Sequence, residues 1–89
     1  MITLVRSQRF ENERRKFVKN SPQRAENLIK SLQRFVGNPR YPSLHIEKLQ
    51  GSKIWTIRID LGNRIFFLWI NQTTALLIDI GPHDKYRQF

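Results

Sequence analysis

The sequence predicts an α+β fold in which two helices pack on one face of an antiparallel β-sheet. Apolar side chains recur at helical spacing between residues 8 and 36, and the period shortens towards two after residue 44. Turn-forming residues divide the second half of the chain into three short segments. Helices that precede a run of strands are typical of the α+β class. The predicted order of elements is therefore β-α-α-β-β-β.

A short strand and a helix are expected at the N-terminal end. Residues 2–5 favour extended backbone. Ser7 can cap a helix that carries Phe10, Phe17 and Val18 on one side. Basic side chains occupy most of the remaining surface of this helix: Arg9, Arg14, Arg15, Lys16 and Lys19. Such a run is either a solvated face or a surface for a polyanion.

A second helix is expected directly after the first. Ser21 is a suitable N-cap, and Pro22 suits the first helical position. Gly37 is a natural stop signal. Five apolar residues between these ends form a coherent stripe: Leu28, Ile29, Leu32, Phe35 and Val36. This stripe is predicted to face the sheet.

Three strands are expected in the second half of the chain. Residues 54–60 alternate, with three apolar side chains on one face: Trp55, Ile57 and Ile59. Residues 64–70 are nearly all apolar, as in a central strand that is buried on both faces. Residues 74–80 form the last strand, and the turns fall at 61–63 and 71–73.

The composition indicates a small, strongly basic globular domain. The chain has 89 residues, and 16 Lys and Arg against 7 Asp and Glu give a net charge of +9. This length allows one domain, which would span residues 1–89. Because cysteine is absent, disulfides, thiolate metal sites and a cysteine nucleophile are excluded.

Neither a membrane span nor a signal peptide is indicated. The longest apolar run, residues 65–70, is far shorter than the roughly 20 residues of a membrane helix. The first residues lack the basic-then-apolar order of a signal peptide. We therefore expect a cytoplasmic protein with a polyanionic partner: nucleic acid, an anionic membrane surface or an acidic protein. A nucleic acid fits best with the polar residues of the strands.

These polar residues occupy positions where a sheet would ordinarily be apolar or inert. Arg58 lies in the middle of a predicted strand, Arg64 opens the next one, and His83 follows the last. The extended segment that enters the sheet adds His45, Glu47 and Lys48. Each residue alone is also typical of an ordinary surface. Together they could converge at one end or face of a small sheet.

The turn between the first two of these strands decides whether the arginines can meet. A three-residue loop at 61–63 would pair Asp60 with Arg64 and place Arg58 and Arg64 on one face. A two-residue loop at Gly62-Asn63 would place them on opposite faces. The sequence leaves both alternatives open.

Four segments together resemble the RelE/ParE superfamily, the toxins of type II toxin–antitoxin pairs. The resemblance covers essentially the whole chain, and it includes the element order and the length. It rests on HIEKLQG at residues 45–51, WTIRI at 55–59, NRIFF at 63–67 and IDIGPHDKY at 78–86. It implies a RelE-like fold, in which a two-helix hairpin packs on a curved antiparallel sheet after an N-terminal strand.

For the RelE-like and YoeB-like branch, the resemblance implies a ribosome-dependent mRNA endoribonuclease that inhibits translation. Arg58 and Arg64 match the strand arginines that hold the scissile phosphate. Glu47 falls at the position of a glutamate general base, and His83 at that of the C-terminal acid. Tyr86 or Phe89 would match the terminal aromatic residue that stacks on a base.

These residue types suit RNA cleavage that needs neither a metal ion nor a cofactor. The adjacent 2′-hydroxyl is the nucleophile, so the site requires a base, cations on the phosphoryl oxygens and an acid at the leaving oxygen. Arginine suits the phosphate because its planar fork binds two oxygens and stays charged. A ring stacked on a base contributes about 1–3 kcal/mol.

The resemblance also implies macromolecular partners. The basic run of the first helix, Arg9, Arg14, Arg15, Lys16 and Lys19, would contact RNA of the 70S ribosome. Lys48 and Lys53 are further candidates, although RelE itself has a richer set of lysines. A cognate antitoxin with an acidic segment would wrap the toxin in a heteromeric complex and fold on binding.

Two other functions are compatible with the sequence. A ParE-like protein would inhibit DNA gyrase without nuclease chemistry, and the combination of His83 with Arg58, Arg64 and Glu47 argues against it. A degenerate, non-toxic module would only bind RNA.

Overall fold

The structure is a computed structural model that describes residues 1–88, with side chains described for residues 1–85. Its helices are α1 (Gln8–Val18) and α2 (Pro22–Gly37), with short 3-10 helices at η1 (Pro42–Leu44) and η2 (His83–Gln88). Its strands are β1 (Thr3–Arg6), β2 (Glu47–Lys48), β3 (Trp55–Arg58), β4 (Asn63–Asn71) and β5 (Thr74–Pro82). The predicted α+β order is confirmed, with the two-residue strand β2 added before the last three strands.

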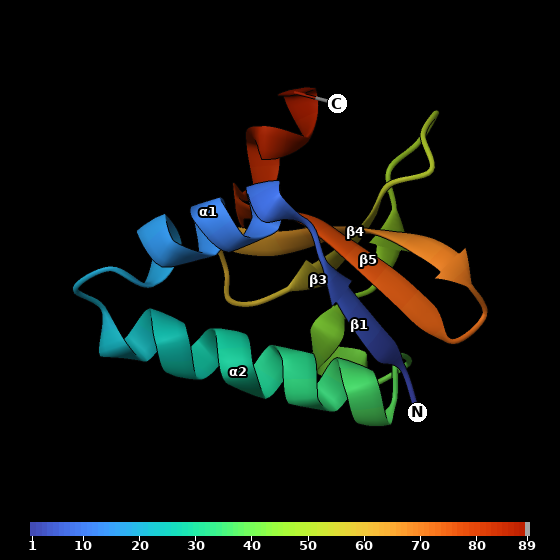
Figure 1. Cartoon of the computed structure of the whole chain (residues 1–89), viewed down its shortest axis with the longest axis horizontal. Coiled ribbons are helices and arrows are strands. Elements are labelled where there is room, and N and C mark those ends of the chain that lie inside the picture. The colour runs from blue at the N-terminus through green and yellow to red at the C-terminus, as the bar shows by residue number, and fades with distance from the viewer. Residues whose placement is uncertain (89) are drawn as a thin grey trace.

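The five strands form one sheet in the order β1-β5-β4-β3-β2. The pairs β3–β4 and β4–β5 are antiparallel, as predicted, and the added strand β2 is antiparallel to β3. Strand β1 lies parallel to β5 at the edge of the sheet (Figure 1). The predicted antiparallel sheet is thus confirmed for β3 to β5, and the parallel strand β1 makes the whole sheet mixed. No hairpin joins β1 to β5, because the helix pair and three strands lie between them in the chain. Antiparallel pairing is consequently not imposed on this edge.

Side-chain caps fix the predicted starts of both helices. The Ser7 hydroxyl accepts a hydrogen bond from the Phe10 amide at 3.0 Å, and the Ser21 hydroxyl accepts one from the Arg24 amide at 3.3 Å. Pro22 occupies the first helical position of α2, where no intrahelical donor is lost. None of the helices in the described residues has the length and apolar character needed to cross a membrane.

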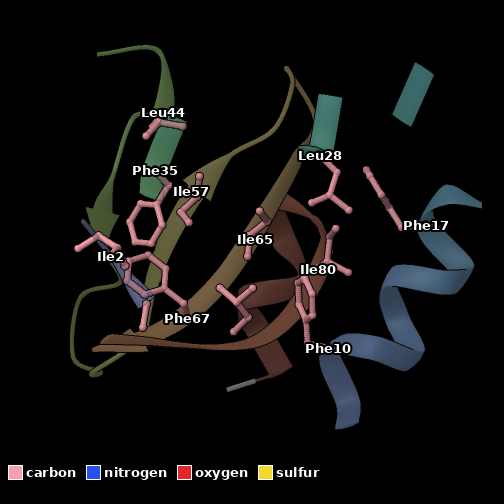
Figure 2. Packing of buried hydrophobic residues seen from close by; sticks show 12 residues of the cluster. Ile2, Phe10, Phe17, Leu28, Phe35, Leu44, Ile57, Ile65, Phe67 and Ile80 are labelled. Carbon is pink, nitrogen blue, oxygen red and sulfur yellow. The ribbon is translucent and has the colours of Figure 1, made fainter. Parts of the chain in front are cut away.

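The hydrophobic core lies between the helix pair and one face of the sheet (Figure 2). Phe10 and Phe17 of α1 and Leu28 and Phe35 of α2 cover that face. The strands contribute Ile57, Ile65, Phe67, Ala75, Leu77 and Ile80 to it. The predicted stripe of α2 is correct except at Ile29, which is 55% exposed because it lies at the margin of the stripe.

The face of the sheet turned away from this core carries the polar residues. Ile65 and Phe67 face the core by the ordinary alternation of β4, and Phe66 between them is in register with Asp79. A bulge in β5 leaves Ile78 without a partner in β4, so Leu77 and Ile80 both face the core although they are three positions apart. Residues paired across strands point to the same face. Thr56 pairs with Phe66 in β4 and with Glu47 in β2, so a row of side chains crosses this second face from Glu47 to Asp79.

Candidate active site

The two strand arginines lie directly opposite each other. Arg58 of β3 is paired with Arg64 of β4, and the Ile59 amide donates a hydrogen bond to the Asn63 carbonyl at 3.0 Å. The loop therefore has three residues, at positions 60–62 rather than 61–63. Because the count is odd, both arginines project from the second face of the sheet.

Asp60 closes this loop instead of pairing with Arg64. Its carboxylate accepts hydrogen bonds from the Gly62 amide and the Asn63 side-chain amide, both at 2.9 Å. Below the loop, the buried Ser31 hydroxyl of α2 donates to the Arg58 carbonyl at 3.2 Å. The backbone next to the arginine pair is thus held by hydrogen bonds within the loop and by a hydrogen bond from α2.

Two like charges at opposed positions on neighbouring strands repel each other. One carboxylate moderates this repulsion: Glu47 Oε1 lies 3.3 Å from Arg64 Nη1. Arg64 is only 16% exposed at its side chain, whereas Glu47 is 57% exposed. Within residues 1–85 no carboxylate pairs with the half-buried side chain of Arg58. The pair is consequently suited to an anion that bridges the two guanidinium groups.

His83 lies beside Glu47 although the two residues are 36 positions apart. A depression of about 290 Å³ is lined by Glu47, Lys48, Leu49, Gln50 and His83. The His83 amide donates a hydrogen bond to the Gly62 carbonyl at 3.1 Å, which ties the start of η2 to the β3–β4 loop. The structure therefore brings together a carboxylate, two arginines, an imidazole and Lys48 around one end of the sheet.

The other predicted contacts are distributed more widely. Lys53 is exposed in the loop between β2 and β3, and His45 lies outside the depression, beside η1, with a backbone φ of 45°. The side chain of Tyr86 and the whole of Phe89 lie outside the described residues. Among the described residues, no three His, Cys, Asp or Glu side chains gather in a way that could hold a metal ion.

The basic residues of α1 differ in their availability. Arg15 and Lys16 are exposed, and so is Lys19, which is the C-cap residue directly after α1. Arg14 lies 3.0 Å from Glu11, and Lys16 lies 3.2 Å from Glu13. Arg9 is half-exposed, and its Nη2 atom lies 2.7 Å from Asp79 Oδ2. Contact of these residues with RNA stays a prediction.

The sequence analysis did not predict a cluster of charged residues that surrounds the buried Asp79 next to the site. It consists of Lys85, Glu13, Asp79 and Arg9, which join η2, α1 and β5. Hydrogen bonds from Lys85 and Lys16 hold the pKa of Glu13 below its usual value of 4.5. A signal was present, since Asp79 interrupts an otherwise apolar strand. Its partners lie 6 to 70 positions away and could not be read from the spacing.

Comparison with known proteins gives a fold match without a close sequence match. No protein-family model matches the chain, and no curated protein matches it in sequence. A YoeB/ParE toxin from Agrobacterium tumefaciens aligns with a TM-score of 0.75 at 15% identity, covering 92% of this chain and 99% of that chain.

Two further solved structures agree. A metal-bound toxin from Helicobacter pylori aligns with a TM-score of 0.76 at 20% identity, covering 96% of this chain and 98% of that chain. The YoeB–YefM toxin–antitoxin complex from Staphylococcus aureus contains a chain that aligns with a TM-score of 0.72 at 14% identity, covering 93% and 98%. The resemblance is thus confirmed at the level of structure: this chain has the fold of the RelE/YoeB-like toxins.

Proposed function

We propose that this protein is the toxin of a type II toxin–antitoxin pair and acts as a ribosome-dependent mRNA endoribonuclease. The observation that carries the proposal is the convergence at one end of the sheet. Arg58 and Arg64 are opposed in register, Glu47 contacts Arg64, and His83 shares a depression with Glu47. The shared fold with YoeB-type toxins supports the same function.

Each group has a role in transesterification. Glu47 accepts the proton of the 2′-hydroxyl, and the 2′-oxygen attacks the neighbouring phosphorus. Arg58 and Arg64 bind the non-bridging oxygens, on which negative charge accumulates. His83 gives a proton to the leaving 5′-oxygen, so the products are a 2′,3′-cyclic phosphate and a 5′-hydroxyl. The mRNA itself supplies the nucleophile, and no metal ion has a role in this scheme.

The open site fits a substrate that another assembly holds in place. The depression is lined by the exposed β2 strand and by η2, and no described segment closes over it. A ribosome that presents mRNA in a fixed geometry would supply the orientation that a small enzyme cannot provide alone. Because the proposed activity depends on ribosomes, we expect it to occur in the cytoplasm. The exposed cations Arg15, Lys16 and Lys19 would contact ribosomal RNA.

A cognate antitoxin is the second proposed partner. The net charge of +9 favours an acidic segment that folds onto the toxin and masks the arginine pair. The YoeB of Staphylococcus aureus is found in a complex with YefM. We expect a comparable heteromeric complex here.

Induced expression in bacteria tests the proposal, with primer extension on a reporter mRNA as the measurement. The expected result is growth arrest with new 5′ ends inside translated codons. Growth arrest with intact mRNA and an SOS response would instead indicate gyrase inhibition. Normal growth together with salt-dependent RNA binding would indicate a non-toxic RNA-binding module.

A purified system tests the chemistry. Ribosomes carrying an mRNA with a single 2′-deoxynucleotide at the cleavage position should resist cutting, because the nucleophile is missing. The same mRNA with the deoxynucleotide one codon away is the matched control and should be cut normally. Equal cutting of both mRNAs would exclude 2′-hydroxyl transesterification.

A further inference from the structure

We propose that Lys85 is a positioning residue, whose ammonium group fastens η2 to α1 and β5 and thereby holds His83 beside Glu47. This inference rests on the proposed nuclease function, since it assigns the element that places the acid. The C-terminal anchor is defined here as Lys85 with its three acceptors: the Glu13 and Asp79 carboxylates and the Ile80 carbonyl.

The contacts of Lys85 use the full capacity of an ammonium group. Its Nζ atom lies 2.9 Å from Glu13 Oε1, 2.9 Å from Asp79 Oδ1 and 3.0 Å from the Ile80 carbonyl oxygen. An ammonium group has three donors, so each donor has one acceptor within hydrogen-bond distance. The side chain is only 14% exposed. A surface lysine does not ordinarily adopt such a position, because its head group is strongly hydrated.

Asp79 makes the anchor necessary. This carboxylate is fully buried in β5, where an unpaired charge would be strongly destabilising. Arg9 of α1 meets one of its oxygens at 2.7 Å, and Lys85 of η2 meets the other. The Ile80 amide also donates to Oδ1 at 2.8 Å. One buried carboxylate therefore ties the beginning of the chain and its C-terminal end to the same strand.

The backbone leaves room for the lysine stem. A Cβ atom added at Gly81 would lie 2.8 Å from Lys85 Cδ, which is closer than such contacts occur. Gly81 is buried, and it is in register with Arg64. The stem of Lys85 therefore passes directly over the strand that flanks the arginine pair. Its position is set by packing as well as by charge.

The anchor and the candidate acid lie on different sides of η2. A 3-10 helix has about three residues per turn, so side chains two positions apart diverge. Lys85 points towards α1 and β5, whereas His83 lines the depression with Glu47. The His83 amide is held by the Gly62 carbonyl. The short helix is thus fixed by its backbone at one end and by the Lys85 side chain within its first turn.

The anchor persists at every physiological pH. Burial lowers the pKa of Lys85, but the hydrogen bonds with Asp79 and Glu13 outweigh burial and raise the pKa above its usual value of 10.5. Stabilisation by a cation with a raised pKa is lost only as the pH rises through that higher value. Lys85 therefore fixes His83 without acting as a pH sensor.

The test compares Lys85→Met with the full-length wild-type protein on ribosomes that carry a defined mRNA. Methionine keeps an unbranched side chain but removes the charge. We expect the single-turnover cleavage rate to fall by about 10- to 100-fold, since a misplaced acid costs orientation. Affinity for the ribosome should stay within about twofold, because the ammonium group of Lys85 is directed towards Glu13, Asp79 and Ile80 of the protein itself. Lys30→Met is the matched control: it removes an exposed lysine paired with Glu26 at 3.0 Å on α2, and it should leave the rate unchanged.

A double variant separates positioning from direct action. If Lys85 acts through His83, Lys85→Met should cause little further loss in a His83→Ala background. If the fold-reduction in rate of the double variant equals the product of the fold-reductions of the two single variants, the proposal is overturned. A wild-type cleavage rate in Lys85→Met itself would also overturn it.

Amide hydrogen exchange gives a readout that does not depend on cleavage. The amides of residues 83–88 should exchange at least about tenfold faster in Lys85→Met than in Lys30→Met. If Lys85→Met does not fold, as judged by circular dichroism, Glu13→Gln replaces it, with the same direction of change and a smaller size. Absence of cleavage by the wild type would overturn the proposed function, while unchanged exchange would overturn the anchor.

Discussion

At the scale of single residues, Arg58 and Arg64 form an unfavourable contact, because two positive charges are paired across neighbouring strands. Arg58 and Arg64 face each other across β3 and β4, and only Arg64 has a carboxylate partner among the described residues. Like charges in such a pair destabilise the sheet, on the scale of the about 0.2–1 kcal/mol by which favourable cross-strand pairs stabilise it. An anion between the guanidinium groups would reverse the sign of this interaction, as the scissile phosphate would in the proposed reaction.

This arrangement predicts opposite effects on stability and activity for Arg58→Gln. The free energy of unfolding should rise slightly, by less than about 1 kcal/mol, because the repulsion is removed. Cleavage of ribosome-bound mRNA should fall by about 10²- to 10³-fold, as it does when one group that stabilises transition-state charge is lost. Urea denaturation and single-turnover cleavage measure the two quantities. A variant that is both less stable and fully active would contradict the assignment.

At the scale of elements, the side-chain cap of α2 contributes to the stability of the helix hairpin. Ser21→Ala removes the hydroxyl that accepts from the Arg24 amide and should lower the free energy of unfolding by about 1 kcal/mol. Ser21→Asn restores a side-chain acceptor and should recover most of that loss. Urea denaturation of both variants is the measurement. Equal stability of Ser21→Ala and the wild type would show that the cap contributes nothing.

The carboxylates of α1 predict the direction of acid sensitivity. The pKa of Glu11 is lowered by its hydrogen bond with Arg14, and that of Glu13 by its hydrogen bonds with Lys85 and Lys16. A carboxylate with a lowered pKa stabilises the fold above its usual value of 4.5, and this contribution is lost as the pH falls through the lower value. The melting temperature should therefore drop below about pH 4.5. Glu13→Gln should weaken the dependence of the melting temperature on pH below about pH 4.5, whereas Glu26→Gln on the exposed face of α2 should leave that dependence unchanged.

At the scale of the whole molecule, three groups of basic residues within the net charge of +9 have different roles. The arginine pair faces the candidate site, Arg9 and Lys85 neutralise a buried carboxylate, and several exposed cations remain on α1. The exposed cations of α1 can approach a large polyanion without disturbing the fold. Ribosome affinity should therefore depend on α1 and on salt.

Matched double variants test this division. Arg15→Gln with Lys19→Gln should reduce the slope of log affinity against log salt by about 1.5–2, since each lost phosphate contact removes about 0.7–0.9. Lys30→Gln with Arg40→Gln removes one arginine and one lysine from exposed positions outside α1 and should leave the slope unchanged. Filter binding to purified ribosomes measures both. If both double variants reduce the slope of log affinity against log salt equally, ribosome affinity depends only on the total charge of the protein.

The sequence by itself determined both α-helices, four of the five strands and their order. Helix caps, apolar periods and turn residues act over a few positions, so Ser7, Ser21 and the alternation in residues 54–60 could be read directly. The burial of residues at the margin of an apolar helix stripe is harder to predict: Ile29 belongs to the stripe of α2 but is exposed. The candidate residues Glu47, Arg58, Arg64 and His83 stood out as polar residues in or next to extended segments. Their roles in catalysis stay predictions.

Only the tertiary structure decided how these residues meet. The three-residue loop at positions 60–62 placed Arg58 opposite Arg64, which neither anticipated turn had specified in register. The parallel pairing of β1 with β5 depends on contacts between the two ends of the chain. The same holds for the anchor, in which Lys85, Glu13 and Asp79 come from three separate elements. Long-range pairing of this kind follows from packing of the whole sheet and helix pair, and no local pattern encodes it.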